Sequence, residues 1–169
     1  MAKIGVIVTD YFEDSEYTKP VDAFTEAGHE VVNIGVEAGK VVKGKKENTP
    51  VTIDKAVTDV SPADFDALLI PGGFSPDILR ANDAPVAFVK DFTASDKPVF
   101  MICHGPQLLI TADVLRGRQV TGYTSIIQDI KNAGAVFIDS EVVVDGNLVS
   151  SRNPGDLPAF IRESMKLLG

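Results

Sequence analysis

Residues 98–110 read PVFMICHGPQLLI and are the stretch around which the rest of the chain is organised. The apolar, β-branched run at residues 99–102 predicts a short buried strand. Cys103 follows at once, and Pro106 opens a second apolar run whose spacing is helical. Proline suits the first turn of a helix. The stretch therefore predicts strand, sharp turn and helix with a thiol at the turn, which is the layout of a nucleophile elbow with cysteine in place of serine.

Cys103 is open to two interpretations at this position. A helix N-terminus directs backbone N–H groups and a positive dipole end at the sulfur, and both favour the reactive thiolate. We therefore expect the pKa of Cys103 to lie below its free value of about 8.5. The alternative is an inert core cysteine at a strand–helix junction. The neighbouring His104 and the elbow position favour the functional interpretation.

The composition bounds the class of protein. A chain of 169 residues, 44% hydrophobic and 24% charged, is typical of one globular domain, and we expect a single domain over residues 1–169. A net charge of −8 argues against nucleic acid and anionic membranes as partners. The single cysteine permits no internal disulfide and fits a reducing cytoplasm. The apolar run within the first ten residues, MAKIGVIVTD, is too short for a signal peptide or a membrane span.

Apolar runs alternate with helical patterns along the chain, and this alternation predicts an α/β fold with a mainly parallel sheet. Strands are expected at residues 4–8, 30–34, 67–70, 99–102 and 119–121, of which those at 4–8, 67–70 and 99–102 are expected to be buried. Helices are expected at about residues 14–27, 84–94, 125–133 and 157–168.

Two segments read as hairpins. Residues 35–50 are rich in Gly and Lys and predict an exposed hairpin or loop excursion, with Lys43, Lys45 and Lys46 as a solvated face. Residues 142–149 predict a β-hairpin with an Asp-Gly turn. Residues 51–60 remain ambiguous.

Three turns are expected at one edge of the sheet, because ligand sites in open α/β sheets form beyond the carboxyl ends of the strands. They are Glu13-Asp14, Pro71-Gly72-Gly73 and Cys103-His104. The amides of Gly72, Gly73 and His104 could hold an oxyanion, since glycine lets a ligand approach the backbone. Glu13 could share a proton with Cys103 if the first strand neighbours the elbow strand. The alternatives are a plain tight turn and a solvated glutamate.

With these pieces in place, the sequence resembles the ThiJ/PfpI superfamily over nearly its whole length, and within it the PfpI-type branch of intracellular proteases and general stress proteins. Single motifs are weak, but the ordered set is specific. The markers are Phe12-Glu13-Asp14 with Glu16, Glu26-Ala27-Gly28-His29-Glu30-Val31, Phe65-Asp66-Ala67-Leu68, Pro71-Gly72-Gly73, Ile102-Cys103-His104-Gly105-Pro106-Gln107, Leu115-Arg116-Gly117-Arg118, Asn132-Ala133-Gly134, Val142-Val143-Val144-Asp145-Gly146-Asn147, and Ser150-Ser151-Arg152 with Pro154 and Asp156-Leu157.

The resemblance implies a flavodoxin-like sandwich and assigns roles. Cys103 would be the nucleophile, Glu13 the acid hydrogen-bonded to it and His104 its partner, with the amides of Gly73 and His104 as the oxyanion hole. Tyr123 matches a tyrosine near the site. In oligomeric proteases of the family a glutamate of the neighbouring subunit orients the histidine. Asp77 stands at that position here and is one methylene shorter, which weakens the peptidase interpretation.

Two classes of function remain open. The first is a cofactor-free cysteine enzyme acting on reactive carbonyls, as in glyoxalase and deglycase activities, or on peptides. The second is a non-enzymatic redox sensor or chaperone that works through oxidation of Cys103. The protein is expected to form a homodimer or higher homo-oligomer.

Two other classes conflict with the residue inventory. A glutaminase of the amidotransferase type needs a histidine downstream of the elbow, and none follows His104. One cysteine and two histidines, His29 and His104, match no zinc spacing.

Overall fold

The computed structural model describes all residues, Met1–Gly169. Its centre is a seven-stranded sheet in the order β10-β11-β7-β6-β1-β2-β5, in which all pairings except β10–β11 are parallel. The strands are β1 (Lys3–Ile7), β2 (Glu30–Gly35), β5 (Lys55–Ala56), β6 (Ala67–Ile70), β7 (Val99–Ile102), β10 (Val143–Asp145) and β11 (Leu148–Ser151). The expected α/β architecture is confirmed.

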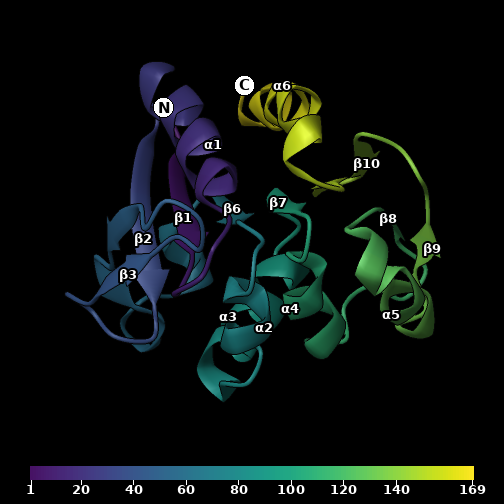
Figure 1. Cartoon of the computed structure of the whole chain (residues 1–169), viewed down its shortest axis with the longest axis horizontal. Helices are drawn as coiled ribbons and strands as arrows, with labels where there is room; N and C mark the ends of the chain where they lie inside the picture. Colours follow the sequence, from purple (N-terminus) through teal and green to yellow (C-terminus); the bar gives the residue numbers. More distant parts are fainter.

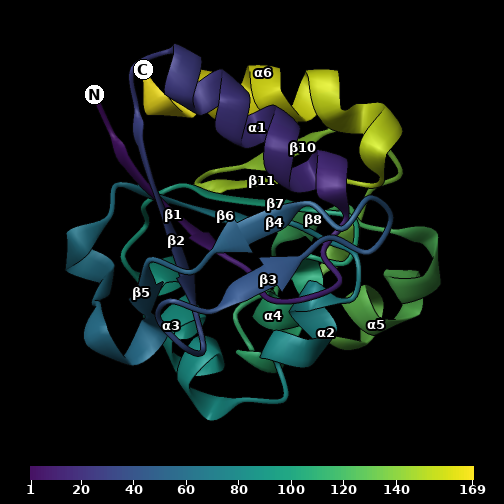
Figure 2. The same ribbon diagram turned by 60° about the vertical axis from the view of Figure 1, so that its left-hand side comes forward.

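Helices cover both faces of the sheet. In Figure 2, α1 (Asp14–Glu26) and α6 (Leu157–Leu168) lie side by side over one face. The opposite face carries α2 (Ser75–Leu79), α3 (Asp83–Ala94), α4 (Pro106–Thr111) and α5 (Ile127–Asn132) (Figure 1). Helix α2 was not expected from the sequence. None of the helices is long and apolar enough to span a membrane.

Each face has its own apolar core, as a sheet sandwiched between two helical layers requires. Alternate residues of one strand point to opposite faces, so Leu68 and Ile70 join the core under α3 and α4, whereas Ala67 and Leu69 join the core under α1 and α6. All four residues of β6 and all four of β7 are buried, which explains their unbroken apolar sequences.

The lysine-rich segment forms a small separate sheet, in which β3 (Val41–Lys43) pairs antiparallel with β4 (Pro50–Thr52). The expected hairpin is therefore present. It folds back onto the loop after β1, because the Tyr11 amide donates to the Lys43 carbonyl and the Lys45 amide donates to the Phe12 carbonyl.

Two further segments differ in detail from expectation. The strand β8 (Gln119–Val120) pairs with β9 (Val136–Phe137) outside the main sheet. In the β10–β11 hairpin Asp145 pairs with Leu148, so the two turn residues are Gly146 and Asn147 and not Asp-Gly. Gly146 has a positive φ of 57°, which glycine adopts without strain.

Candidate active site

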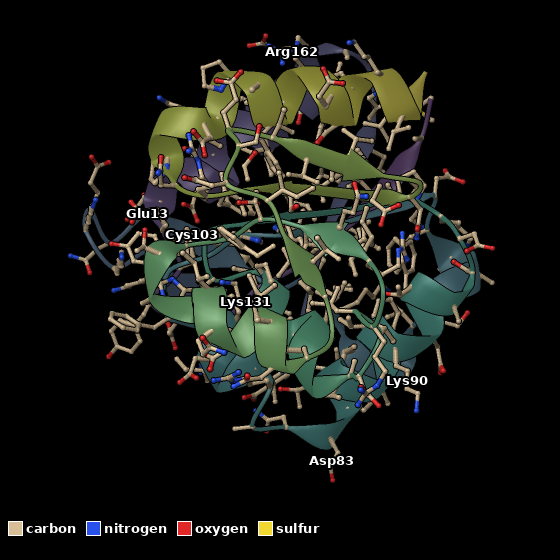
Figure 3. The ribbon with its side chains drawn as sticks, turned by 90° about the vertical axis from the view of Figure 1, so that its right-hand side faces the viewer. Glu13, Asp83, Lys90, Cys103, Lys131 and Arg162 are labelled. Atoms are coloured by element: carbon tan, nitrogen blue, oxygen red, sulfur yellow. The ribbon has the colours of Figure 1, made fainter.

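The carboxyl ends of β1, β6 and β7 bring three loops to one edge of the sheet. These strands are adjacent in the order β7-β6-β1, so the loops that follow them meet. The loops are also tied to one another, because the Glu13 amide donates to the Gly72 carbonyl and the Phe74 amide to the Tyr11 carbonyl. Figure 3 shows Glu13 and Cys103 at the same end of the molecule. The convergence expected from the sequence is therefore present.

Cys103 stands at a strained elbow. Its φ is +62°, a left-handed conformation that non-glycine residues rarely adopt and that costs on the order of 1–3 kcal/mol. Its amide donates to the Ser151 carbonyl, and its carbonyl accepts from the Tyr123 amide, so backbone contacts on both sides hold the turn. The side chain is only 6% exposed.

Glu16, and not Glu13, is the acid that lies against the Cys103 thiol. Glu16 is fully buried on α1, and its Oε1 accepts a hydrogen bond of 2.8 Å from the Gly72 amide. Burial raises the pKa of Glu16 to about 8, against weaker opposing effects that include the Gly72 amide and the Cys103 thiol. The carboxyl group is therefore protonated at pH 7 and able to donate a proton beside the sulfur.

Gly72 is required for this contact. A Cβ at Gly72 would lie 2.5 Å from Glu16 Oε1 and 2.7 Å from Cys103 Cβ, closer than real contacts allow. Its amide is taken by Glu16, so the expected role of Gly72 in an oxyanion hole is wrong. The amides of Gly73 and His104 do face the sulfur, and they oppose the rise of its pKa. These two amides are therefore the candidate donors to an oxyanion at this site.

Glu13 lines the same cavity but has other partners. Its Oε2 lies 3.2 Å from Lys45 Nζ and its Oε1 lies 3.4 Å from Lys46 Nζ. The assignment of Glu13 as the acid hydrogen-bonded to Cys103 is therefore wrong, because its carboxylate is held by two ammonium groups. The expected exposure of Lys43, Lys45 and Lys46 is confirmed, but the ion pairs that Lys45 and Lys46 make with Glu13 were not expected.

The expectation of a lowered thiol pKa is also wrong for this structure. Burial raises the pKa of Cys103 to about 12, and the charge of ionised Glu16 acts in the same direction. The Gly73 and His104 amides and the charge of Lys45 act against it without reversing it. Cys103 therefore rests as a thiol, and a base must take its proton when it reacts.

His104 supplies a base within reach. Its Nδ1 lies 3.3 Å from Cys103 Sγ, and its Nε2 lies 3.1 Å from Ser125 Oγ. Burial lowers the pKa of His104, with Lys45 acting in the same direction, so the imidazole is neutral at pH 7. A neutral ring that donates from Nε2 to Ser125 presents an acceptor Nδ1 to the thiol. No sequence pattern singled out Ser125 for this role.

Tyr123 lines the cavity, whereas Asp77 lies outside its lining. The Tyr123 ring stacks on His104 with centroids 4.9 Å apart. Asp77 Oδ1 lies 3.0 Å from Arg80 Nη2 within α2, so in the single chain it pairs with Arg80 and not with His104. His29 lies away from the site, where its Nδ1 accepts from the Ala2 amide.

The family model for the DJ-1/PfpI family matches residues 2–167 of this sequence. The chain belongs to this family. It is 62% identical over 168 residues to "Protein/nucleic acid deglycase 2" of Escherichia coli strain K12, covering 99% of this chain and 98% of that protein. It is 61% identical over 167 residues to "General stress protein 18" of Bacillus subtilis strain 168, covering 98% of this chain and 97% of that protein.

A solved structure extends the likeness to three dimensions. The chain matches a two-domain protein of Anabaena variabilis that contains DJ-1/ThiJ/PfpI-like and ferritin-like domains, with a TM-score of 0.98 and 40% identity. The match covers all of this chain and 48% of that one, so this chain spans about half the length of the Anabaena protein. The DJ-1/PfpI membership and the flavodoxin-like fold expected from the sequence are thus confirmed.

Proposed function

We propose that this DJ-1/PfpI chain is a cofactor-free cysteine enzyme that acts on reactive carbonyls, either free dicarbonyls such as methylglyoxal or their adducts on thiols and amines. The observation that carries the proposal is the contact of a neutral Glu16 carboxyl group with the Cys103 thiol. A proton donor and a nucleophile side by side are what addition to an aldehyde requires. The identity of 62% to a protein named as a deglycase supports the same chemistry.

The proposed reaction begins with addition. The Cys103 sulfur attacks the aldehyde carbon of methylglyoxal, its proton passes to His104 Nδ1, and the carbonyl electron pair moves to oxygen. Glu16 donates its proton to that oxygen, and the product is a hemithioacetal. The Gly73 and His104 amides face the sulfur, and they are placed to stabilise negative charge on the oxygen as it forms.

The second stage is a proton shift followed by hydrolysis. The Glu16 carboxylate removes the hydrogen on the former aldehyde carbon as a proton, and the proton on His104 neutralises the neighbouring carbonyl oxygen. Glu16 then returns its proton to the second carbon, and the hydroxyl on the first carbon loses its proton to His104, which gives a thioester of lactate. Water cleaves this thioester to lactate and the free Cys103 thiol. Methylglyoxal and water become lactate, so no oxidant, reductant or cofactor is needed. An adduct first eliminates its thiol or amine, which regenerates the aldehyde, and the aldehyde then follows the same steps to lactate.

The experiment is to incubate the protein with methylglyoxal and with its hemithioacetal adducts, and to measure lactate by an enzymatic assay. We expect more than ten turnovers per chain in the wild type and none in Cys103→Ser. Lactate formation that persists in Cys103→Ser, or its absence from the wild type, would refute the proposal. The proposal includes a cytoplasmic location, since a thiol enzyme needs a reducing compartment.

A cysteine peptidase is the second candidate, and the 3.3 Å contact of Cys103 Sγ with His104 Nδ1 favours it. Hydrolysis of a fluorogenic peptide library distinguishes the two. Peptide cleavage lost in Cys103→Ser, with no lactate formed from methylglyoxal, would replace the carbonyl proposal by the peptidase.

The non-enzymatic alternative is a redox sensor. A neutral Glu16 is placed to donate a hydrogen bond to an oxidised Cys103, which favours a stable sulfinate. Stoichiometric oxidation of Cys103 by peroxide, with no turnover of carbonyls or peptides, would support this role.

A further inference from the structure

Two lysines of the β3–β4 hairpin enter the cavity that contains Cys103. This cavity of about 350 Å³ is lined by Lys45, Lys46, Glu13, Cys103 and His104, together with Phe74, Tyr123 and Pro154. The two ammonium groups lie 3.2 Å and 3.4 Å from the two oxygens of Glu13. They therefore line the same cavity as the reacting thiol while remaining open to solvent, and the charge of Lys45 acts on Cys103 directly.

The loop that carries the lysines is held in place by Asp14. The buried carboxylate of Asp14 accepts hydrogen bonds from the amides of Lys46, Glu47 and Thr49. Gly44 packs directly on this carboxylate, in a space that a Cβ would fill. Burial raises the pKa of Asp14, but hydrogen bonds from Thr49 and from the Lys46 amide outweigh it and hold the pKa below its ordinary value. Asp14 is thus an ionised anchor under the loop.

Lys45 is fixed from two further sides. Its amide donates to the Phe12 carbonyl, and its ammonium lies 5.4 Å from the centroid of the Phe74 ring, within the range of a cation–π interaction. Its side chain is 28% exposed, against 64% for Lys46. Lys45 is therefore the inner and better ordered cation of the pair, and Lys46 stands at the mouth of the cavity.

The charges in the cavity leave an excess of one positive charge. Among the residues that line it, Lys45 and Lys46 contribute two and Glu13 removes one, while Cys103 and His104 are neutral at pH 7. The ionised Asp14 lies beneath the loop, outside the lining. This local charge contrasts with the net charge of −8 for the whole chain. Each ammonium has three N–H donors, of which Glu13 takes one, so further donors remain for a ligand.

We infer that Lys45 and Lys46 form an anion-binding subsite beside Cys103, and that the compounds that react at Cys103 carry a carboxylate or phosphate group. An acidic protein would otherwise repel such compounds, and a local pair of cations reverses that effect at the thiol. The anion preference does not depend on the reaction. Its extension to carbonyl substrates rests on the proposed function.

The primary test uses two alkylating reagents that differ only in charge. Cys103 is the only cysteine, so no other thiol competes for iodoacetate or iodoacetamide, and intact mass reports the product. We expect the ratio of the iodoacetate rate to the iodoacetamide rate to exceed that of 2-mercaptoethanol at least fivefold. Lys45→Gln and Lys46→Gln should each lower this ratio, and the double variant should bring it close to the value for 2-mercaptoethanol.

Lys43→Gln is the matched control, because Lys43 is an exposed lysine of the same hairpin that does not line the cavity. It removes the same charge and should leave the ratio within twofold of wild type. A wild-type ratio equal to that of 2-mercaptoethanol would overturn the inference. An equal loss in Lys43→Gln and Lys46→Gln would also overturn it, since that result reflects only the overall field.

Two further experiments identify the bound anion and distinguish anion binding at the subsite from turnover at Cys103. Protection of Cys103 from iodoacetamide by inorganic phosphate or by acetate, against chloride at equal ionic strength, shows which anion binds more tightly. For turnover, methylglyoxal adducts of N-acetylcysteine and of its neutral amide are compared, and the acid should give the higher kcat/KM. Absence of turnover on both adducts would refute the proposed function, while the alkylation ratio still decides the subsite.

Discussion

The carboxyl group of Glu16, in the first turn of α1, lies against the thiol of Cys103, in the turn that follows β7. The contact is possible because Gly72 places only a hydrogen atom where a side chain would block it. The same glycine donates its amide to Glu16 Oε1, so one residue both makes room for the carboxyl group and orients it. The acid and the nucleophile thus belong to one rigid unit that spans three loops.

The buried Glu16 should make the stability of the fold depend on pH. The native state keeps the Glu16 proton up to about pH 8, whereas the unfolded chain releases it near pH 4.5. The unfolded state binds fewer protons in this range, so the free energy of unfolding falls as the pH rises from about 5 to 8. Denaturant titrations should show this decline in the wild type and a flatter profile in Glu16→Gln.

Glu163→Gln is a control for that measurement. Arg162 and Lys166 lower the pKa of Glu163 on the surface of α6, so the stabilisation it contributes is lost only at acid pH. This variant should keep the wild-type decline between pH 5 and 8. An unchanged decline in Glu16→Gln would show that another group causes it.

The raised thiol pKa predicts slow alkylation at neutral pH. The iodoacetamide rate at Cys103 should continue to rise beyond pH 9, because burial and the charge of Glu16 disfavour the thiolate. In Glu16→Gln that charge is absent, so the midpoint should move to lower pH. A wild-type rate that reaches its plateau below pH 8 would contradict the assignment and restore the expectation of an activated thiolate.

The sequence predicted most of the fold because β6 and β7 are continuous apolar runs and helical patterns separate most of the strands of the main sheet. The misassigned acid shows where this reasoning fails. Glu13 and Glu16 are separated by about one helical turn, and the family motif contains both. The motif therefore does not show which of the two lies against Cys103. The helix pattern does, because Glu16, Pro20 and Phe24 follow one another at intervals of four and are all buried. A glutamate in line with the apolar stripe of a helix is a signal that was available.

Other parts of the site depend on tertiary contacts that no local pattern encodes. Ser125 reaches His104 only because the chain after β8 returns across the elbow. Lys45 and Lys46 enter the cavity because Asp14 accepts from the amides of their loop. In both cases the partner is distant in the sequence, and the residue type alone favours a solvent-exposed position.

Ser125 should act by positioning His104. The hydrogen bond between its hydroxyl group and Nε2 selects the ring form that presents a bare Nδ1 to the thiol. Ser125→Ala should therefore lower kcat for carbonyl turnover by about tenfold with little change in KM, and shift the lower limb of the kcat–pH profile. Ser125→Thr keeps the hydroxyl group and should recover most of the loss. An equal loss in both variants would indicate a packing effect instead.

Gly72 should tolerate no side chain. In Gly72→Ala the new Cβ would meet Glu16 Oε1, Cys103 Cβ and the Ile102 carbonyl oxygen, all within 2.8 Å. Two of these three neighbours are backbone or Cβ atoms, so the elbow or the carboxyl group must shift. We expect destabilisation of roughly 1–3 kcal/mol and a loss of carbonyl turnover of about 100-fold in the fraction that remains folded. Circular dichroism and denaturant titration separate the two effects, and a fully active variant would contradict the geometry.

Asp77 is the residue through which a neighbouring copy of the chain would complete the site. We propose a homodimer or higher homo-oligomer in which the α2 segment borders the site of a neighbouring copy. The exposed Phe74 and Ile78 would supply apolar contacts, since they are 59% and 37% exposed. Asp77 is committed to Arg80 within its own chain, so reaching His104 of another copy would require this surface pair to open, at a cost of about 1 kcal/mol or less.

If that contact forms, activity per chain should fall on dilution below the dissociation constant of the oligomer, and Asp77→Asn should lower kcat with no loss of stability. Arg80→Gln is the informative partner variant, because it frees Asp77 without removing the carboxylate and should preserve or raise activity. A monomer at micromolar concentration in sedimentation velocity, with full activity in Asp77→Asn, would exclude the shared site. Activity would then depend on Cys103, Glu16, His104 and Ser125 of a single chain.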